Sequence, residues 1–378
     1  MSESANSSPH SFVPPRLTGP RDSGDGWVED GTGRKFWGRY GAAGLLAHDP
    51  QRGILLQHRA NWSHFGGTWG LPGGAKHGGE SSVEGAIREA HEEAGVPTDS
   101  LLLKFTSILD LGFWSYTTVV TRVTSPFDAV VADAESIEVR WVAVDEVANL
   151  PLHPGFGAAW PELRAELTRP VVLIVDSANV VGSRPNGWWR DRLGATNTFA
   201  ANLRARARIG FTSDSLGIGL PGTRWWPEVV LVVEGQARDA ALPVVPQARD
   251  AALRAADDRA DSSALARANT AAAELGRGAH QRGVDLQIVA AEHDGDQAIV
   301  DAVRAQLVAP LPSSAAAPDS PGPALPTPAF PTPALPGAIP RVFVVTADRE
   351  LSDRVTSLGA AVHGPGWLWA LIDELPAE

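Results

Sequence analysis

Three glutamates fall within one turn of a segment whose pattern predicts a helix: Glu89, Glu92 and Glu93. Side chains three and four residues apart share one face of a helix, so these carboxylates would repel one another without a cation. Carboxylate oxygens are hard ligands that favour Mg²⁺ or Mn²⁺, and such ions commonly also bind substrate phosphates. The spacing therefore predicts a divalent metal site that acts on a phosphorylated substrate.

The helix that would carry these glutamates has clear start and stop signals. Ser81 and Glu84 form an S-x-x-E capping box, and Gly95 follows the last turn, where a left-handed residue often ends a helix. The glycine-rich approach LPGGAKHGG lets the backbone come close to the same ion. One buried face is predicted from apolar residues at helical spacing, namely Val83, Ala86, Ile87, Ala90 and Ala94.

The spacing over residues 73–96 resembles the complete signature of the Nudix hydrolases. An isolated glutamate pair would be interpreted as a solvated acidic face, but that interpretation does not explain a full set of fixed positions. The resemblance covers roughly residues 38–168. The matching positions are Gly74, Glu80, Arg88, Glu89, Glu92, Glu93, Gly95 and Val96.

This resemblance implies an α+β Nudix fold, with a mixed sheet between helices. It also implies hydrolysis of a nucleoside diphosphate linked to another moiety, such as a nucleoside triphosphate, ADP-ribose or a dinucleotide. By the same resemblance, Arg88 would orient the glutamates, Glu80 would assist them, and an ionised glutamate would activate the attacking water. The implied metal ligands are Glu89, Glu92, Glu93 and the carbonyl of Gly73.

Three further residues are candidates for substrate binding. Arg59 follows a strand-like run and could contact phosphates, although an ordinary surface arginine is the alternative. Many Nudix enzymes recruit a carboxylate from outside the signature. The resemblance therefore makes Glu135 and Glu138, which precede Trp141, candidates for that role.

From Arg169 onwards the chain has a different pattern. Four continuous apolar runs, at 171–176, 229–234, 286–291 and 342–348, do not alternate with polar residues, which is typical of parallel strands covered on both faces. Because helical stretches separate them, we expect an α/β domain with a parallel sheet covered by helices on both faces. Residues 310–340 contain 11 prolines and are predicted to form an extended insertion within this domain.

Acidic residues follow several of these runs. The carboxyl edge of an open α/β sheet is where ligands bind, and converging carboxylates there could hold Mg²⁺ for phosphodiester cleavage. The segments DSAN (176–179), GDQAI (295–299) and TADRE (346–350) resemble PIN-like and NYN nuclease domains, although Gln297 stands where those domains often have a second acid. The resemblance implies metal binding by Asp176, Asp296 and Asp348, and substrate positioning by Asn179 and Thr346.

Single-stranded RNA is the partner that this second domain suggests. Between residues 184 and 208, six arginines stand against one acid, Asp191, and Trp188 and Trp189 lie among them. Arginines with aromatic rings can hold a single strand by phosphate contacts and stacking. A solvated basic face of an amphipathic helix is an equally open interpretation. A further alternative is that this half binds RNA or nucleotides without cutting them, which Gln297 and the net charge of -12 favour.

Length and composition agree with this division. A chain of 378 residues predicts two domains. We expect a disordered tail at 1–26, a Nudix domain at 27–168 and a PIN-like domain at 169–378. The absence of cysteine excludes disulfides, thiolate zinc sites and a thiol nucleophile. No apolar run approaches the ~18 residues of a membrane span, and no signal-peptide pattern opens the chain, so we expect a cytoplasmic protein. Few lysines and many alanines and prolines suggest a high-GC bacterial genome.

Overall fold

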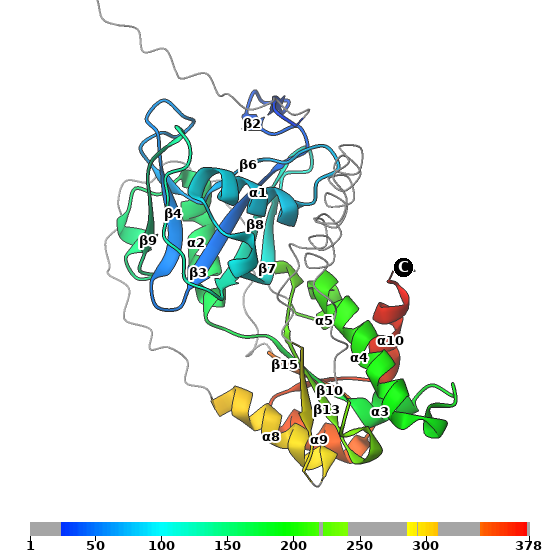
Figure 1. Ribbon diagram of the computed structural model, residues 1–378. Coiled ribbons are helices and arrows are strands. Elements are labelled where there is room, and N and C mark those ends of the chain that lie inside the picture. The colour runs from blue at the N-terminus through cyan, green and yellow to red at the C-terminus, as the bar shows by residue number, and fades with distance from the viewer. Residues whose placement is uncertain (1–23, 219–221, 241–285, 293, 309–340, 376–378) are drawn as a thin grey trace, which may run out of the picture. The chain divides into compact units, whose positions relative to one another are not determined.

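The computed structural model describes residues 24–218, 222–240, 286–292, 294–308 and 341–375 (Figure 1). Most of the predicted tail and the proline-rich insertion at 310–340 lie outside the described residues. So does most of the stretch 239–280, whose composition rich in Ala, Asp and Arg predicts a helix. The chain forms two compact units. Unit 1 contains residues 1–100, 109–119 and 125–159, and unit 2 contains 101–108, 120–124 and 160–378. The domain boundary near residue 168 stays a prediction.

Unit 1 begins with a small hairpin and continues into a larger mixed sheet. The hairpin pairs β1 (Trp27–Glu29) with β2 (Lys35–Trp37) in antiparallel register. In the sheet, β8, β3, β4 and β5 follow one another, while β6 pairs with β3 and β9 pairs with β4. All eight residues of β3 are buried, as expected for a central strand rich in Ala and Leu. The strands are β3 (Ala42–Asp49), β4 (Gly53–Arg59), β5 (Trp69–Gly70), β6 (Gly73–Ala75), β7 (Leu101–Asp110), β8 (Ser115–Val123) and β9 (Ser136–Val142), with β7 and β8 divided between the units.

The predicted glutamate helix is α1 (Ser82–Ala94), which packs against β3 and β6. Its capping box is confirmed, because the Ser81 side chain accepts from the backbone N–H of Glu84 and the Glu84 carboxylate accepts from that of Ser81. Its end is also confirmed, because Gly95 adopts the left-handed conformation with φ of 64°. The buried face holds most of the predicted residues, and a short 3₁₀ turn, η1 (Thr98–Ser100), follows.

The segment after β9 differs from the sequence prediction. The sequence VDEVANL at 144–150 predicts a helix, but the structure forms only a 3₁₀ turn there, η2 (Val147–Asn149). The sequence also predicts a helix near Pro161–Thr168, where proline would stand at the start. The structure instead forms α2 (Pro154–Leu167), which runs through that proline. An interior proline costs about 3 kcal/mol, so packing must offset it. A stripe at helical spacing supplies that packing through the buried side chains of Phe156, Trp160, Leu163 and Leu167.

The core of unit 2 is a parallel sheet, as predicted. It consists of β10 (Val172–Asp176), β13 (Glu228–Val233), β14 (Leu286–Ala290), β15 (Val342–Val345) and β16 (Ala361–His363). Their order is β14-β13-β10-β15-β16, and every ladder is parallel. After β10, the chain adds β13 and then β14 on one side of that strand. It then adds β15 and β16 on the other side. The strand order therefore reverses between β10 and β15.

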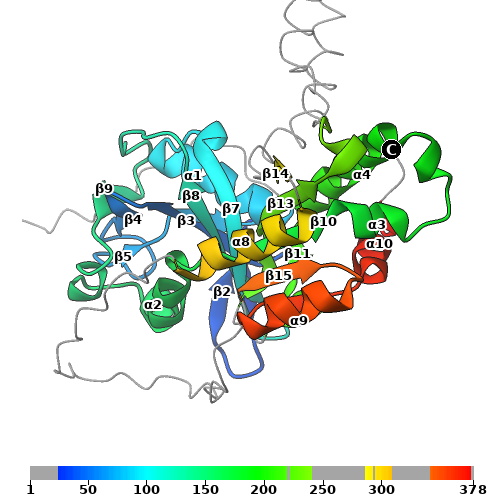
Figure 2. The ribbon, with the colours of Figure 1, turned by 90° about the horizontal axis from the view of Figure 1, so that it is seen from below.

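Helices cover both faces of this sheet, which confirms that prediction (Figures 1 and 2). On one face, Val172 and Ile174 of β10 share a core cluster with side chains of α8 and α9. Leu173 and Val175, the alternate residues of the same strand, are fully buried outside that cluster and so face the other side, where α3, α4 and α10 lie. The helices are α3 (Ser177–Gly182), α4 (Arg192–Ile209), α8 (Gly295–Val308), α9 (Arg349–Ser357) and α10 (Pro365–Asp373).

Unit 2 also contains short elements beside β7. β12 pairs with β7 and β11, and the rings of Trp225 and Phe105 stack with their centroids 4.7 Å apart. These elements are β11 (Phe211–Thr212), α5 (Ser213–Leu216) and β12 (Gly222–Trp225), with 3₁₀ turns η3 (Trp188–Arg190) and η4 (Gly235–Ala237) elsewhere in the unit. Within the described part of the chain, no helix is long and apolar enough to span a membrane.

Candidate functional site

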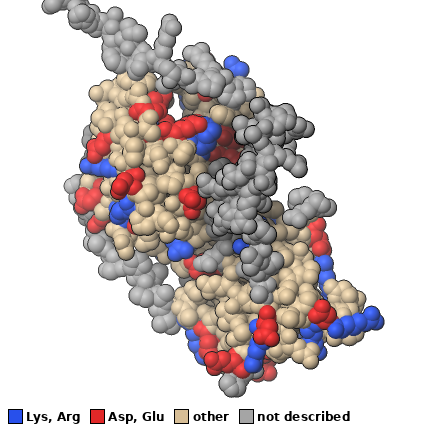
Figure 3. All heavy atoms as spheres, in the orientation of Figure 1, with Lys and Arg blue, Asp and Glu red and all other residues tan. Residues whose placement is uncertain are grey.

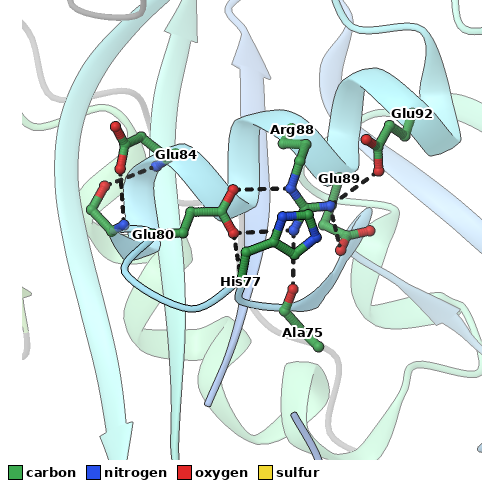
Figure 4. Close-up of polar contacts among 8 residues, drawn as sticks. Ala75, His77, Glu80, Glu84, Arg88, Glu89 and Glu92 are labelled. Carbon is green, nitrogen blue, oxygen red and sulfur yellow. Dashed lines mark hydrogen bonds and ion pairs between the residues drawn. The ribbon is translucent and has the colours of Figure 1, made fainter. Parts of the chain in front are cut away.

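Arg88 of α1 lies at the centre of a hydrogen-bond network (Figure 4). Its Nε and Nη2 donate to the two carboxylate oxygens of Glu80, at 2.9 and 3.1 Å. Its Nη1 donates to Oε1 of Glu89 at 2.9 Å and to Oε2 of Glu92 at 3.0 Å. Nη2 also donates to the carbonyl of Ala75 at 3.0 Å. One guanidinium thus fixes three carboxylates and the end of β6, which is geometry that the planar fork of arginine can provide.

Glu80 holds the glycine-rich loop onto this network. The backbone N–H of His77 donates to Oε2 of Glu80 at 2.8 Å. Burial acts to raise the pKa of Glu80, but the hydrogen bonds from Arg88 and His77 outweigh it and lower that pKa. The pKa of Arg88 is raised in turn by Glu80 and Glu89, despite the opposing effect of burial. Both partners therefore remain ionised near neutral pH.

Glu93, on the same helix, is buried, with 6% of its surface exposed. Its Oε2 accepts a 2.9 Å hydrogen bond from the backbone N–H of Gly73. Burial raises its pKa well above the usual range, and the charge of Glu89 raises it further. Burial also raises the pKa of Glu89, although Arg88 opposes that effect. The structure thus brings Gly73, Glu89 and Glu93 together, with two partly uncompensated carboxylates on one side of α1.

The two acids predicted near β9, Glu135 and Glu138, have different surroundings in the structure. Glu135 lies before the strand, where its charge and that of Asp133 raise the pKa of Glu93. Burial and Asp133 raise the pKa of Glu135 itself. Glu138 instead pairs with Arg140 at 3.7 Å on an exposed part of β9. Asp133 was missed by sequence reasoning, although its place two residues before Glu135 in a polar loop is the signal that could have identified it.

Arg59 lies close to Asp133 and Glu135, and Tyr116 lies close to Glu93. Arg59 ends β4 and donates from Nε to the carbonyl of His64 at 3.1 Å, and its charge acts on Asp133 and Glu135. Tyr116 of β8 is half-buried, and burial and the charge of Glu93 raise its pKa. A Cβ on Gly44 would collide with the Tyr116 hydroxyl. No sequence signal distinguished this tyrosine from a core aromatic residue.

A divalent metal fits this donor set, although the site is not preformed. Among the described residues, no three His, Asp or Glu side chains are arranged to hold a metal ion, and Arg88 occupies the carboxylates that would do so. Glu93 is buried and Glu89 is half-buried, and the charge of Glu89 raises the pKa of Glu93. A divalent cation would relieve this repulsion, and carboxylate oxygens are the hard ligands that Mg²⁺ and Mn²⁺ prefer. A Cβ on Gly74 would lie 2.7 Å from the Glu89 carboxyl group, so glycine keeps that approach open.

The predicted residues of unit 2 meet at the carboxyl edge of the parallel sheet. Oδ2 of Asp176 accepts hydrogen bonds from Oγ1 of Thr346 at 2.8 Å and from Nδ2 of Asn179 at 2.7 Å. Oδ1 of Asp176 accepts from the backbone N–H of Asn179 at 3.1 Å and caps α3. This group bridges β10 and β15, which is where the strand order reverses.

Asp296 and Asp348 lie near the same edge. Burial raises the pKa of Asp296, and the charges of Asp176 and Asp348 raise it further. Oδ1 of Asp348 caps α9 by accepting from the backbone N–H of Leu351 at 2.8 Å. Gln297 contacts α9 instead, because its Oε1 accepts from Arg354 at 2.6 Å. Among the described residues this edge, too, holds no ready metal site.

The arginines predicted to bind RNA include two that are engaged within unit 2, Arg184 and Arg206. Arg184 pairs with Asp373 and lies over the ring of Trp369, 3.9 Å from its centroid. Arg206 is buried and donates to the backbone carbonyl of Gly210. On the face that Figure 3 shows, basic and acidic side chains are interspersed. Trp189 remains exposed at 54% of its surface.

Comparison with known proteins supports the interpretation of the N-terminal half. Residues 38–161 match the NUDIX domain model. "Putative 8-oxo-dGTP diphosphatase 3" of Mycobacterium tuberculosis is 50% identical over 154 residues, which are 38% of this chain and 70% of that protein. A "Nucleoside triphosphate pyrophosphatase/Nudix hydrolase fusion protein" of Bifidobacterium longum is 39% identical over 171 residues, 43% of this chain and 36% of that protein.

Among solved structures, the Nudix hydrolase RenU of M. smegmatis is 49% identical, with a TM-score of 0.35. That match covers 38% of this chain and 94% of the RenU chain. The alignment with the M. tuberculosis relative covers 70% of that protein, and half of the aligned residues are identical. The chain therefore belongs to the Nudix family of hydrolases, which act on phosphoric anhydride bonds.

Proposed function

We propose that this chain is a Mg²⁺-dependent pyrophosphohydrolase that cleaves a nucleoside diphosphate linked to another moiety. One observation carries the proposal: Arg88 fixes Glu80, Glu89 and Glu92, and the charge of Glu89 acts on the buried carboxylate of Glu93. The M. tuberculosis relative is named for 8-oxo-dGTP, so a nucleoside triphosphate is the first substrate class to test. ADP-ribose and dinucleotides follow, and Mn²⁺ is the alternative metal.

The metal ligands would be Glu89, Glu93, the carbonyl of Gly73 and, after it leaves Arg88, Glu92. Glu92 has 57% of its side chain exposed, so its pair with Arg88 is screened by water and readily exchanged for a cation. A bound divalent ion would polarise a phosphoryl oxygen of the substrate. Glu80 and Arg88 would hold Glu89 and the glycine-rich loop in place throughout, which preserves the spacing of the ligands.

The remaining groups would manage the proton and the phosphates. Water forms a bond to one phosphorus atom, the bridging P–O bond breaks, and the departing phosphate carries away the bridging oxygen. Glu135 would accept the proton from the water, because its raised pKa makes it a better base near neutral pH. Arg59, close to Glu135 and Asp133, would bind a phosphate of the substrate. A nucleoside triphosphate would thus yield a monophosphate and pyrophosphate.

The test is release of nucleoside monophosphate from dGTP, 8-oxo-dGTP, ADP-ribose and Ap4A in the presence of Mg²⁺. We expect Glu93→Gln to lower kcat by at least about 100-fold, because it removes a proposed metal ligand. The matched control on the same helix is Glu84→Gln, which preserves the S-x-x-E/Q capping box. Unchanged turnover by the Glu93 variant would refute the metal assignment.

A second function is favoured by the position of Asp176 and Thr346. Ligands of open α/β sheets bind where the strand order reverses, and these two residues meet at that point. We propose that unit 2 is a PIN-like domain in which Asp176, Asp296 and Asp348 hold Mg²⁺ to cleave single-stranded RNA, with Asn179 and Thr346 positioning the strand. Both functions would be exercised in the cytoplasm.

The alternative is that unit 2 binds RNA or a nucleotide without cutting it. The hydrogen bond between Gln297 and Arg354 favours this alternative. Gln297 stands where a second acidic metal ligand would be expected, and its side-chain oxygen is already bound to Arg354. Incubation of the full chain with single-stranded RNA and Mn²⁺ separates the two. Cleavage that Asp176→Ala abolishes supports the nuclease, whereas RNA binding without cleavage supports the binding module.

A further inference from the structure

Five rings form a second feature of unit 1, which we call the ring cluster: Trp27, Trp37, His64, Phe65 and His153. The centroid distances are 5.3 Å between Trp27 and Trp37, 5.5 Å between Trp27 and His64, 4.3 Å between His64 and Phe65, and 4.8 Å between Phe65 and His153. All four pairs meet edge to face, with interplanar angles of 66–83°. Parallel stacking, the mode that a planar heterocycle offers, is therefore not used within these pairs.

Three large apolar rings of the cluster are exposed to solvent. Trp27 is 51% exposed, Phe65 45% and Trp37 41%. Single exposed hydrophobic residues are ordinary, but large rings that contact one another at the surface mark a binding site. Other aromatic residues nearby have internal roles. Trp69, for example, is buried and stacks on His58 at 4.7 Å.

The N-terminal hairpin presents two of these rings. Trp27 and Trp37 are directly paired across β1 and β2, so their side chains share one face. Phe36, on the opposite face, packs on Trp114 with centroids 4.7 Å apart and anchors the hairpin. The turn is fixed by Asp30, whose side chain accepts from the backbone N–H groups of Thr32 and Arg34, both at 2.9 Å. The hairpin is thus built to hold Trp27 and Trp37 outward.

The loop after β4 presents Phe65 in a strained conformation. Phe65 has a φ of 54°, which is unusual for a bulky residue and is typical of functional sites. Its carbonyl accepts a 2.6 Å hydrogen bond from Oγ1 of Thr68. The next residue must be glycine, because a Cβ on Gly66 would lie 2.5 Å from the carbonyl oxygens of Ala60 and Asn61. The loop therefore maintains the exposed position of Phe65 at a conformational cost.

Arg59 connects the ring cluster to the catalytic acids. Its Nε donates to the carbonyl of His64, and its charge acts on His153 as well as on Asp133 and Glu135. Burial, with a contribution from Arg59, lowers the pKa of His153 to about 4, so its ring is neutral at pH 7. One cation, Arg59, therefore contacts the loop that carries part of the ring cluster and acts on the acids Asp133 and Glu135.

We propose that the ring cluster is the subsite for the nucleobase of the substrate, with Trp27 and Phe65 as stacking residues. The inference rests on the proposed hydrolysis of a nucleotide and adds the residues that bind its base. A nucleotide has a flat aromatic base at one end and phosphates at the other. The ring cluster would meet the base, while Arg59 and the metal-binding carboxylates would meet the phosphates. Base–aromatic stacking is also tolerant of base identity, because every base offers a flat face.

The proposal is tested by calorimetric binding of the four deoxynucleoside monophosphates, which lack an anhydride bond to cleave, against 2-deoxyribose 5-phosphate, which lacks the base. We expect the full chain to bind the monophosphates more tightly than the sugar phosphate. Trp27→Leu and Phe65→Leu should each weaken monophosphate binding about tenfold and leave sugar phosphate binding unchanged. Tyr40→Leu, which changes an aromatic residue of the same unit that is 50% exposed, should change neither.

Kinetics give a second readout. With dGTP and Mg²⁺, both Leu variants should raise KM about tenfold while kcat changes less than twofold, because the lost contact is distant from the reacting phosphorus. Equal binding of monophosphates and sugar phosphate by the unchanged chain would overturn the proposal, as would equal weakening of both in the variants. If the base-dependent binding appears but no substrate is hydrolysed, the proposed hydrolase function fails while the subsite stands.

Discussion

Oγ1 of Thr346 donates a 2.8 Å hydrogen bond to Oδ2 of Asp176, linking β15 to β10 at the edge where the parallel sheet reverses its strand order. Both side chains are buried, with 2% and 6% of their surfaces exposed. A buried carboxylate must have its oxygens satisfied. In unit 2, Thr346 and Asn179 supply those donors from within the chain.

Removal of the Thr346 hydroxyl should therefore destabilise unit 2. We expect Thr346→Val to lower the free energy of unfolding by about 1.5–3 kcal/mol, because Asp176 loses a donor to its charge while staying buried. Thr346→Ser keeps the hydroxyl and is the matched control. Urea unfolding of both variants measures the difference. Equal stability of the Val and Ser variants would show that the hydrogen bond contributes nothing.

The geometry of Arg88 predicts that charge alone will not replace it. Arg88→Lys retains one positive charge but cannot donate to Glu80, Glu89 and the Ala75 carbonyl together. We expect kcat for nucleotide hydrolysis to fall about 10- to 100-fold, because Glu89 loses its fixed position. Arg140→Lys on β9 tests the general cost of such a change. Similar kcat values for the two variants would contradict a positioning role.

The structure also predicts different outcomes for the two acids near β9. Glu135→Gln should lower kcat about 100-fold with little change in KM, because a base acts on the reacting water. Glu138→Gln should change kcat less than twofold, since Glu138 pairs with Arg140 at the surface. Steady-state kinetics of the two variants distinguish them directly. A larger loss in the Glu138 variant would reverse the assignment.

Sequence reasoning was most successful where spacing along one helix decided the outcome. The capping box at Ser81 and the left-handed Gly95 depend on local signals, and both are seen at the ends of α1. The orienting role of Arg88 was implied by the family resemblance, and the structure shows its hydrogen bonds to Glu89 and Glu92. The parallel sheet of unit 2 was also predictable, because continuous β-branched runs need cover on both faces. In both cases the residues that decide the structure lie close together in the sequence, within one helix or one strand.

Features that depend on tertiary contact were not predictable. Asp133 and Tyr116 approach Glu93 only because a loop and β8 fold beside α1. Glu138 was equivalent to Glu135 in the sequence, and only the path of the chain into β9 separated them. The sequence also placed Trp188 and Arg206 in one basic segment, whereas the structure buries the arginine against a backbone carbonyl. The pattern of charges along the sequence shows which residues are charged, but not the direction in which their side chains point.

Lys104 of β7 predicts a distinctive pH dependence of stability. Burial lowers the pKa of Lys104 from 10.5 to about 8 in the folded chain, and its ammonium group donates to the carbonyl of Leu167. Below pH 8, both states are protonated and the folded chain bears the full cost of burying the charge. Between pH 8 and 10.5, the unfolded chain binds more protons, so this group makes stability rise with pH. The charges that act on it are those of Glu228, Arg122, Glu166 and Arg341.

The measurement compares urea unfolding of the unchanged chain and of Lys104→Met at pH 7, 8, 9 and 10. The difference in unfolding free energy should shift in favour of the unchanged chain across this range, by up to about 3 kcal/mol. The Met variant provides the control for all other titrating groups. A difference that stays constant with pH would show that the pKa of Lys104 is not depressed.

The proline within α2 predicts a stabilising substitution. Pro161 cannot donate to the carbonyl of Gly157, and helix formation survives because Phe156, Trp160 and Leu163 are buried on one face. Pro161→Ala should restore the missing hydrogen bond and raise the free energy of unfolding by about 1–3 kcal/mol. Glu162→Ala, at the adjacent exposed position, reports the effect of a surface alanine alone. If Pro161→Ala is no more stable than Glu162→Ala, then packing has already shaped α2 around the proline, and the helix gains nothing from the added donor.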